Sequence, residues 1–231
     1  MTLAVLFLSS ALAGPGPIDA ALVTDFPVLV GASVAWEPTS RLRAELTGGF
    51  LPGPYLDTIN WGLTTFDVYS DTTAELIDAV LQDALIVHAQ VGYRLIEDRG
   101  LSFSLGYQHI GLAGDTTDIS LLIDADVSEE VYEKAKEEVG ELDVSVSPHM
   151  ITGEVGYQWL LRERLVLRSS LAFAYTVQAS ATVSTTEDAR GPAGQQALDA
   201  LTDASEDYLV DVFEQWVHLP MLGVSVGYRF P

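Results

Sequence analysis

The sequence predicts an all-β fold, an antiparallel up-and-down β-barrel of about eight strands that spans a membrane and carries α-helices in three long loops. Three observations predict this fold. A short motif ending in an aromatic residue recurs four times, bulky apolar and small polar residues alternate along each predicted strand, and aromatic residues mark both strand ends. Together they describe a sheet whose two faces differ in chemistry.

The recurring motif is V-A-W at residues 34–36 and V-G-Y at residues 91–93, 155–157 and 226–228. A short charged turn follows each of the first three copies and leads into another alternating run. This unit of strand, tight turn, strand and long insert is typical of antiparallel hairpins. Seven strands are visible, at residues 27–37, 41–50, 85–95, 100–110, 149–160, 164–178 and 218–230. Because single-chain bacterial barrels have an even number of strands, we expect an eighth at residues 16–25, or at 2–13.

Each strand has one bulky, uncharged face, such as Leu85, Val87 and Val91, and one small polar face, such as His88 and Gln90. Alternation alone leaves open whether the apolar face points inward, as in a soluble barrel, or outward, as in a membrane barrel. The bulky face would overfill a small barrel, which favours the membrane arrangement. Two aromatic belts, about 9–11 strand residues apart, also match the interfaces of a bilayer. The belts are Trp36, Tyr93, Tyr157, Tyr228 and Phe230 beside the tight turns, and Phe50, Tyr107 and Tyr175 at the far strand ends.

The charge of the chain is confined to the inserts. The 231 residues include 33 acids and 11 bases, for a net charge of −22, yet 48% are hydrophobic. Residues 51–84, 111–148 and 179–217 hold 25 of the acids and three of the bases, so the remaining residues balance at eight of each. Residues 14–231 are therefore expected to form one neutral, lipid-embedded domain with three acidic inserts that lie in water.

Each insert contains an apolar stripe at helical spacing, at residues 76–84, 127–139 and 198–216. We expect these helices to pack together as a cap over one mouth of the barrel, with the apolar stripes inward and the acids outward. The alternative is a set of separate, solvated loop helices.

The last strand, LGVSVGYRF at residues 222–230, resembles the C-terminal strand of bacterial outer-membrane β-barrels, although Pro231 follows the terminal aromatic. By size the chain is most like the small OmpA/OmpX-like eight-stranded barrels. The resemblance implies a Gram-negative outer membrane, extracellular long loops, contact with outer-membrane lipid and lipopolysaccharide, and recognition by the barrel-assembly machinery. Residues 1–13 contain an apolar run that resembles a secretory signal peptide, without the usual basic residues before it.

Two sets of polar residues on the small face are candidate sites. Arg43, Glu45, Glu154 and Arg168 lie near one height, and because buried charges must pair we expect an ionic network that plugs the lumen. Four residues each follow a belt aromatic and are expected to form a polar ring at the periplasmic mouth, namely Glu37, Arg94, Gln158 and Arg229.

Other functions lack a signal in this sequence. An acidic chain with pI about 4.2 is a poor match for nucleic acid, and the absence of cysteine excludes Cys-ligated metal sites. No cofactor or specific metal site is predicted, although diffuse binding of divalent cations by the acidic loops is left open. His88, His109, His149 and His218 lie toward the insert ends of their strands, but no nucleophile is fixed beside them. We therefore predict a non-enzymatic structural or surface-interaction role. The alternatives are a barrel that binds or passes a small hydrophobic ligand and, less favoured, an outer-membrane hydrolase.

Overall fold

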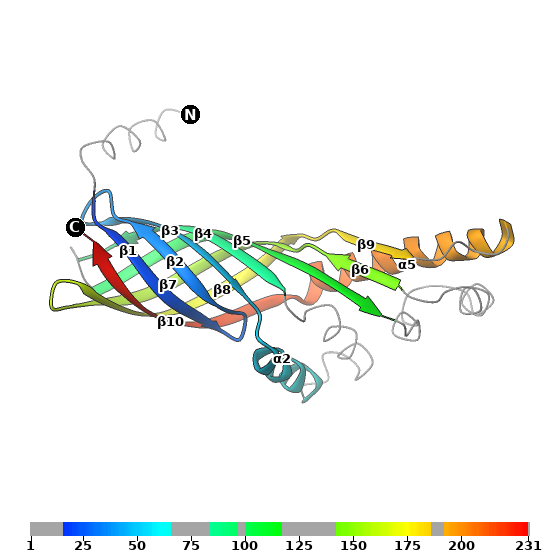
Figure 1. Cartoon of the computed structure of the whole chain (residues 1–231), viewed down its shortest axis with the longest axis horizontal. Helices are drawn as coiled ribbons and strands as arrows, with labels where there is room; N and C mark the ends of the chain where they lie inside the picture. The colour runs from blue at the N-terminus through cyan, green and yellow to red at the C-terminus, as the bar shows by residue number, and fades with distance from the viewer. Residues whose placement is uncertain (1–15, 66–83, 97–99, 117–141, 186–191, 231) are drawn as a thin grey trace, which may run out of the picture.

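The computed structural model describes residues 16–65, 84–96, 100–116, 142–185 and 192–230. Eight strands close into an antiparallel barrel, shown in Figure 1: β1 (Ile18–Phe26), β2 (Leu29–Trp36), β3 (Leu42–Phe50), β4 (Leu85–Arg94), β5 (Gly100–Thr116), β7 (His149–Leu161), β8 (Leu165–Gln178) and β10 (His218–Phe230). The order around the barrel is β4-β3-β2-β1-β10-β8-β7-β5, and pairing of β4 with β5 completes the circle. The predicted barrel is confirmed.

The eighth strand is β1, within one or two residues of the expected segment at 16–25. It pairs with β2 on one side and with β10 on the other, and Ile18 lies opposite Phe230. This pairing of the first and last strands removes both open sheet edges. Closure matters because an unpaired backbone N–H or C=O in hydrocarbon costs several kcal/mol.

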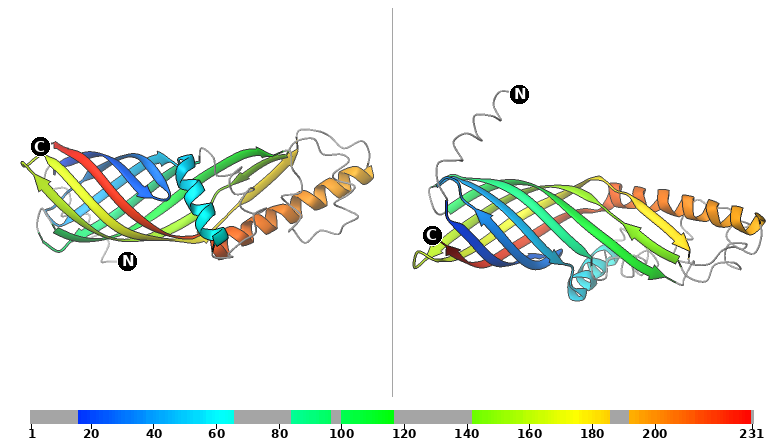
Figure 2. Two further views of the ribbon diagram at one scale, coloured as in Figure 1. Left: turned by 90° about the horizontal axis from the view of Figure 1, so that it is seen from below. Right: turned by 45° about the horizontal axis from the view of Figure 1, so that its top comes forward.

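The first residue of β1, Ile18, and the last residue of β10, Phe230, lie at one end of the barrel, and the long inserts leave from the other end (Figures 1 and 2). We call these the terminal end and the insert end. At the terminal end, β7 and β8 are joined by a tight turn in which Arg162 and Glu163 have positive φ values of 53° and 66°. This conformation is the mirror-image turn whose twist matches that of the flanking strands.

Two inserts extend the sheet beyond the barrel, which the sequence analysis did not predict. β6 (Leu142–Val146) pairs with the outer part of β5 and with β9 (Ala181–Thr185), so the three strands form a projection at the insert end. β5 therefore reaches six residues past its predicted end. Alternation of Leu142, Val144 and Val146 was the available sequence signal.

The helix predicted at 198–216 is confirmed as α5 (Pro192–Trp216), and within the described residues it packs on the projection. Leu198, Leu209 and Phe213 are buried on its apolar face, and Leu209 and Phe213 belong to one buried cluster with Val144 and Val183. Two of its acids accept hydrogen bonds from backbone N–H groups in or just before β9, Glu206 from Val183 N at 2.8 Å and Glu214 from Ala179 N at 3.0 Å. The helix therefore covers and satisfies an edge of the projecting sheet, and both figures show it running outward from the barrel.

The first insert has a helix in an unexpected place. α2 (Gly53–Thr65) follows β3 directly, whereas the stripe predicted at 76–84 lies outside the described residues except for Ala84, which is not helical. α2 rests beside the short β1–β2 turn. Leu56 is buried there, the Tyr55 ring meets Phe26 edge-on at 5.0 Å, and a 2.6 Å hydrogen bond joins the Tyr55 and Thr24 hydroxyls. The second predicted helix, at 127–139, and the signal-like residues 1–13 also lie outside the described residues.

Candidate functional site in the lumen

Eight buried charged side chains form one continuous chain inside the barrel. In order of contact they are Arg94, Glu37, Arg229, Asp19, Arg43, Glu45, Arg168 and Glu154. Bases and acids alternate along it, and each residue is at most 9% exposed. The chain holds four positive and four negative charges, so its formal charge is zero. We call it the lumen charge chain.

The centre of the lumen charge chain crosses the barrel. Glu45 stands on β3 and Arg168 on β8, which are four places apart in a closed ring of eight strands and therefore lie on opposite walls. Arg168 Nη1 donates to Glu45 Oε2 at 2.9 Å, and its Nη2 donates to Glu154. Arg43 Nε and Gln90 Nε2 also donate to Glu45, at 3.1 and 3.3 Å. Charge-assisted bonds of this kind tie the two walls together.

The two predicted residue sets meet through residues that bridge them. Glu37 accepts from Arg94, Arg229 and Arg43, with distances of 2.5, 2.7 and 3.1 Å. Arg94 Nη2 also donates to Gln158 Oε1 at 3.2 Å. The ring at the terminal end and the network at mid-height are therefore one assembly.

Asp19 is the member of the lumen charge chain that sequence reasoning missed. It is 1% exposed, accepts from Arg43 at 2.7 Å and from Arg229 at 2.8 and 3.0 Å, and lies directly opposite Arg229 in the β1–β10 register. The signal was available, because Asp19, Ala21 and Val23 alternate with Ala20 and Leu22. Asp19 could be recognised only after residues 16–25 were accepted as a strand.

The insert end of the lumen has a different chemistry. Inward positions there are apolar, including Leu29, Ile86, Ile110, Met150 and Met221, and they form one buried cluster with Leu56 and Phe213. The sequence predicted a small polar inward face along the whole of each strand, and the structure shows such a face only in the terminal half and the middle. Between the two halves, a cavity of about 20 Å³ beside Arg168 and Asp25 has room for about one water molecule.

The four histidines lie in the half of the barrel that is nearer the insert end. His88 is buried and hydrogen-bonds Thr152 at 2.8 Å, His149 bonds the Tyr107 hydroxyl, and rings stack between His109 and His149 and between His218 and Tyr175. Asp83 and Asp115, the acids that stand five residues before His88 and six residues after His109, have no described side chain. Among the described residues there is no group of three or more His, Asp or Glu arranged to hold a metal ion.

The outer wall decides what kind of barrel this is. Along β4, Leu85 and Val91 are 64% and 61% exposed, whereas His88 and Arg94 are 4% and 2% exposed. The same inversion recurs on the other barrel strands, and all the predicted belt aromatics are exposed on the outer wall. This is a transmembrane β-barrel. A soluble barrel would hide these apolar side chains and expose the charges, so that alternative is wrong.

Comparison with known proteins finds a likeness at the level of the fold. No protein-family model and no curated protein matches the chain. Among solved structures, the barrel resembles the N-terminal β-barrel domain of Pseudomonas aeruginosa OprF, at 12% identity over 93% of this chain and 96% of that one, with a TM-score of 0.43. Acinetobacter baumannii CarO matches at 12% identity over 94% and 98%, with a TM-score of 0.39. A major outer membrane protein from Thermus thermophilus matches at 13% identity over 93% and 100%, with a TM-score of 0.43.

In the part of the chain that the structure describes, no helix combines the length and the apolar character needed to cross a membrane.

Proposed function

We propose that this chain is an integral protein of the bacterial outer membrane whose lumen is closed by the lumen charge chain, and whose acidic inserts face the cell exterior. Its role is structural or surface-interacting, without catalysis. The observation that carries the proposal is the Glu45–Arg168 bond between opposite walls, at 2.9 Å. The exposed apolar wall would contact lipid and lipopolysaccharide, and the strand ending in Phe230 would engage the barrel-assembly machinery.

Electrostatics support a closed lumen. Breaking a buried ion pair from one side leaves an unpaired charge, which costs about 3–5 kcal/mol. Each internal member of the lumen charge chain has a partner of opposite sign on both sides, so an ion entering the lumen would have to displace more than one such bond. The small cavity beside Arg168 supports the same conclusion, since its volume has room for about one water molecule and is too small for a hydrated ion.

Conductance across a planar bilayer tests the closed lumen. The refolded wild-type barrel is expected to show no steady open state. Replacing both Glu45 and Arg168 by Ala removes the crossing bond and two charges of opposite sign, so we expect stepwise channel openings. Asp207→Ala, on the exposed face of α5, is the control and should leave the membrane silent. A wild-type protein with a steady ionic current would overturn the plugged lumen.

Fractionation and gel migration test the location. The boiled and unboiled protein should migrate differently on SDS gels, and the protein should be recovered with outer membranes. Recovery as a soluble periplasmic protein would overturn the proposed location. Cleavage of α5 by a protease added to whole cells would place the inserts outside, and protection of α5 in intact cells would reverse the orientation.

A second candidate function, binding of a small hydrophobic ligand at the insert end, is favoured by the apolar inward cluster around Ile86, Ile110 and Met150. A fluorescent fatty acid titrated into the refolded barrel tests it. Saturable binding that is weakened by Ile110→Asp would favour this function over a purely structural role.

A further inference from the structure

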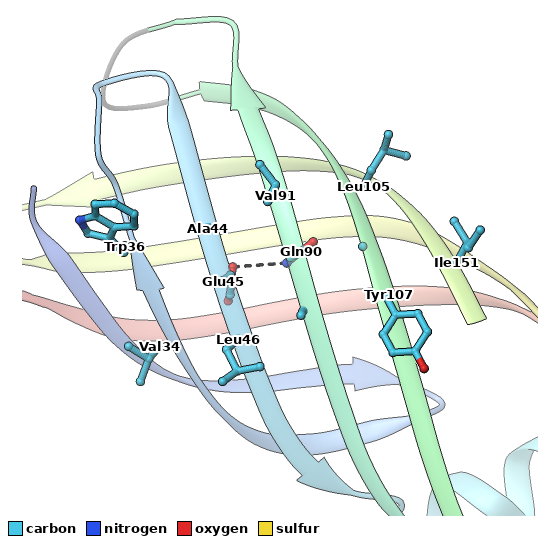
Figure 3. A pocket seen from close by; sticks show the side chains of 12 residues that line it. Val34, Trp36, Ala44, Glu45, Leu46, Gln90, Val91, Leu105, Tyr107 and Ile151 are labelled. Atoms are coloured by element: carbon cyan, nitrogen blue, oxygen red, sulfur yellow. Dashed lines mark hydrogen bonds between the residues drawn. The ribbon is translucent and has the colours of Figure 1, made fainter. Parts of the chain in front are cut away.

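The outer wall of the barrel carries a groove. It has a volume of about 690 Å³ and crosses the outward faces of strands β2 to β5. Figure 3 shows Trp36, Leu46, Val91, Leu105 and Tyr107 around it, with the Glu45–Gln90 hydrogen bond lying beneath on the lumen side. Sites of this volume are typical for a small molecule or part of a lipid.

Two alanines make the groove. Ala44 lies opposite Trp36 on one side and Val91 on the other, and Ala89 lies opposite Leu46 and Tyr107. Directly opposed outward residues are close neighbours across a strand pair. A methyl group between two large side chains therefore leaves a depression, and the two depressions adjoin because Ala44 and Ala89 occupy diagonal positions on β3 and β4.

A cation stands at the terminal end of the groove. Arg41 immediately precedes β3 and is exposed, and its Nη1 donates to the Tyr93 hydroxyl at 3.2 Å. Tyr93 belongs to the aromatic belt and lies one outward position beyond Val91, which lines the groove, so the guanidinium lies at the belt next to this end of the groove. Guanidinium groups recognise phosphate with paired N–H donors.

The chain contains a matched arrangement without the alanines. Arg164 precedes β8 and donates to the Tyr228 hydroxyl at 2.8 Å. The backbone also matches, because Arg94 N donates to the Arg41 carbonyl and Arg229 N donates to the Arg164 carbonyl, both at 2.7 Å. The position that corresponds to Ala44 is Leu167, and the position that corresponds to Ala89 is Val224. The Arg164 site therefore has the cation and the tyrosine beside bulkier outward residues.

We propose that the groove is a binding site for one phospholipid, with an acyl chain over Ala44 and Ala89 and the phosphate on Arg41. Apolar character and volume select the chain, and charge complementarity at the belt selects an anionic headgroup rather than an uncharged one. The choice of a phospholipid rests on the proposed function, which places the terminal end in the phospholipid leaflet.

Native mass spectrometry of the full-length refolded barrel tests this site, with palmitoyl-oleoyl phosphatidylglycerol added in mild detergent. Wild type should retain one lipid. Arg41→Gln, which removes the cation, and Ala89→Leu, which fills the floor, should each weaken retention by about tenfold, equivalent to about 1.4 kcal/mol. Arg164→Gln should change it by less than about twofold, within the range of an ordinary surface substitution.

A gain of binding provides a second test. Leu167→Ala combined with Val224→Ala should open a groove beside Arg164 and add a second retained lipid. Equal losses from Arg41→Gln and Arg164→Gln would show general rim attraction and overturn the site. Barrel dimers that disappear with Ala89→Leu would assign the groove to a second copy instead. Because the lipid is counted in detergent, recovery of the protein outside the outer membrane would overturn the location without altering this result.

Discussion

Asp19 and Arg229 are 210 residues apart in the sequence and join the first and last barrel strands through two hydrogen bonds of 2.8 and 3.0 Å. They are directly opposed in the β1–β10 register, where the barrel closes. Asp19 also binds Arg43, so the residue that seals the seam belongs to the lumen charge chain. Closure of the sheet and the lumen charge chain are thus connected through one carboxylate.

Asp19→Asn should be strongly destabilising, because it leaves Arg43 and Arg229 with one fewer buried counter-charge. We expect a loss of about 3–5 kcal/mol in the free energy of unfolding, measured by urea titration followed by tryptophan fluorescence. Asp199→Asn, on the exposed face of α5, should change stability by less than about 0.5 kcal/mol. Equal stability of the Asp19→Asn variant and wild type would contradict a role for this contact in sealing the barrel.

Gly106 and Gly153 should respond oppositely to alanine. A Cβ on Gly106 would lie 2.5 Å from Thr152 Oγ1 and 2.6 Å from His88 Nε2, whereas a Cβ on Gly153 would meet nothing within 4 Å. Gly106→Ala should therefore cost about 1–3 kcal/mol through overpacking of the lumen. Gly153→Ala should be neutral or stabilising by up to about 1 kcal/mol, since glycine is unfavourable inside a strand. Urea unfolding of both variants gives the comparison, and a neutral Gly106→Ala would mean that the lumen can relax around it.

The β7–β8 turn should be stabilised by residues that adopt positive φ more readily. Arg162 and Glu163 both have positive φ, a backbone conformation that is less favourable for these residues than for glycine or asparagine. Replacing them by Asn and Gly should raise the free energy of unfolding by about 1–2 kcal/mol. Arg162→Lys with Glu163→Gln keeps the strain and serves as the control. If both double variants unfold at the same urea concentration, the turn conformation carries no measurable strain.

Glu206 should control local opening of the projection. Its carboxylate accepts from Val183 N at 2.8 Å, and Glu206→Ala removes the only partner that the structure gives this N–H within the described residues. We expect hydrogen exchange at Val183 to rise about fivefold, equivalent to about 1 kcal/mol of local stability. Exchange within β3 and β4 should not change, because the barrel remains closed. Asp207→Ala, one residue along on the exposed face, should leave Val183 exchange as in wild type.

Local patterns predicted most of the barrel. Seven strands and the possible eighth could be predicted because strand alternation depends only on neighbouring residues. The helix α5 could be predicted because Leu198, Leu209 and Phe213 share one helical stripe. β6 and β9 were missed because each has five residues and is defined by its pairing partner. The place of α2 was also missed, since its docking on Phe26 and Thr24 depends on the shortness of the β1–β2 turn, which is a property of the assembled rim.

Only part of the candidate site could be predicted from the sequence, for a similar reason. Burial requires Arg43, Glu45, Glu154 and Arg168 to find counter-charges, and that much follows from their position on the inward face. Which charges meet depends on the strand order and register, which place β3 opposite β8 and Asp19 opposite Arg229. The roles of Asp19 and Glu37 as bridges between two expected clusters are consequences of that geometry.

By itself, the sequence determined a neutral alternating body with acidic inserts, because alternation and charge are local properties of the chain. Only the tertiary structure decided that the apolar face points outward, that the buried charges form one neutral chain, and that the inserts build a sheet projection. The physical reason is closure. Joining β1 to β10 brings together residues about 200 positions apart, and the contacts made across a closed barrel cannot be deduced from neighbours along the chain.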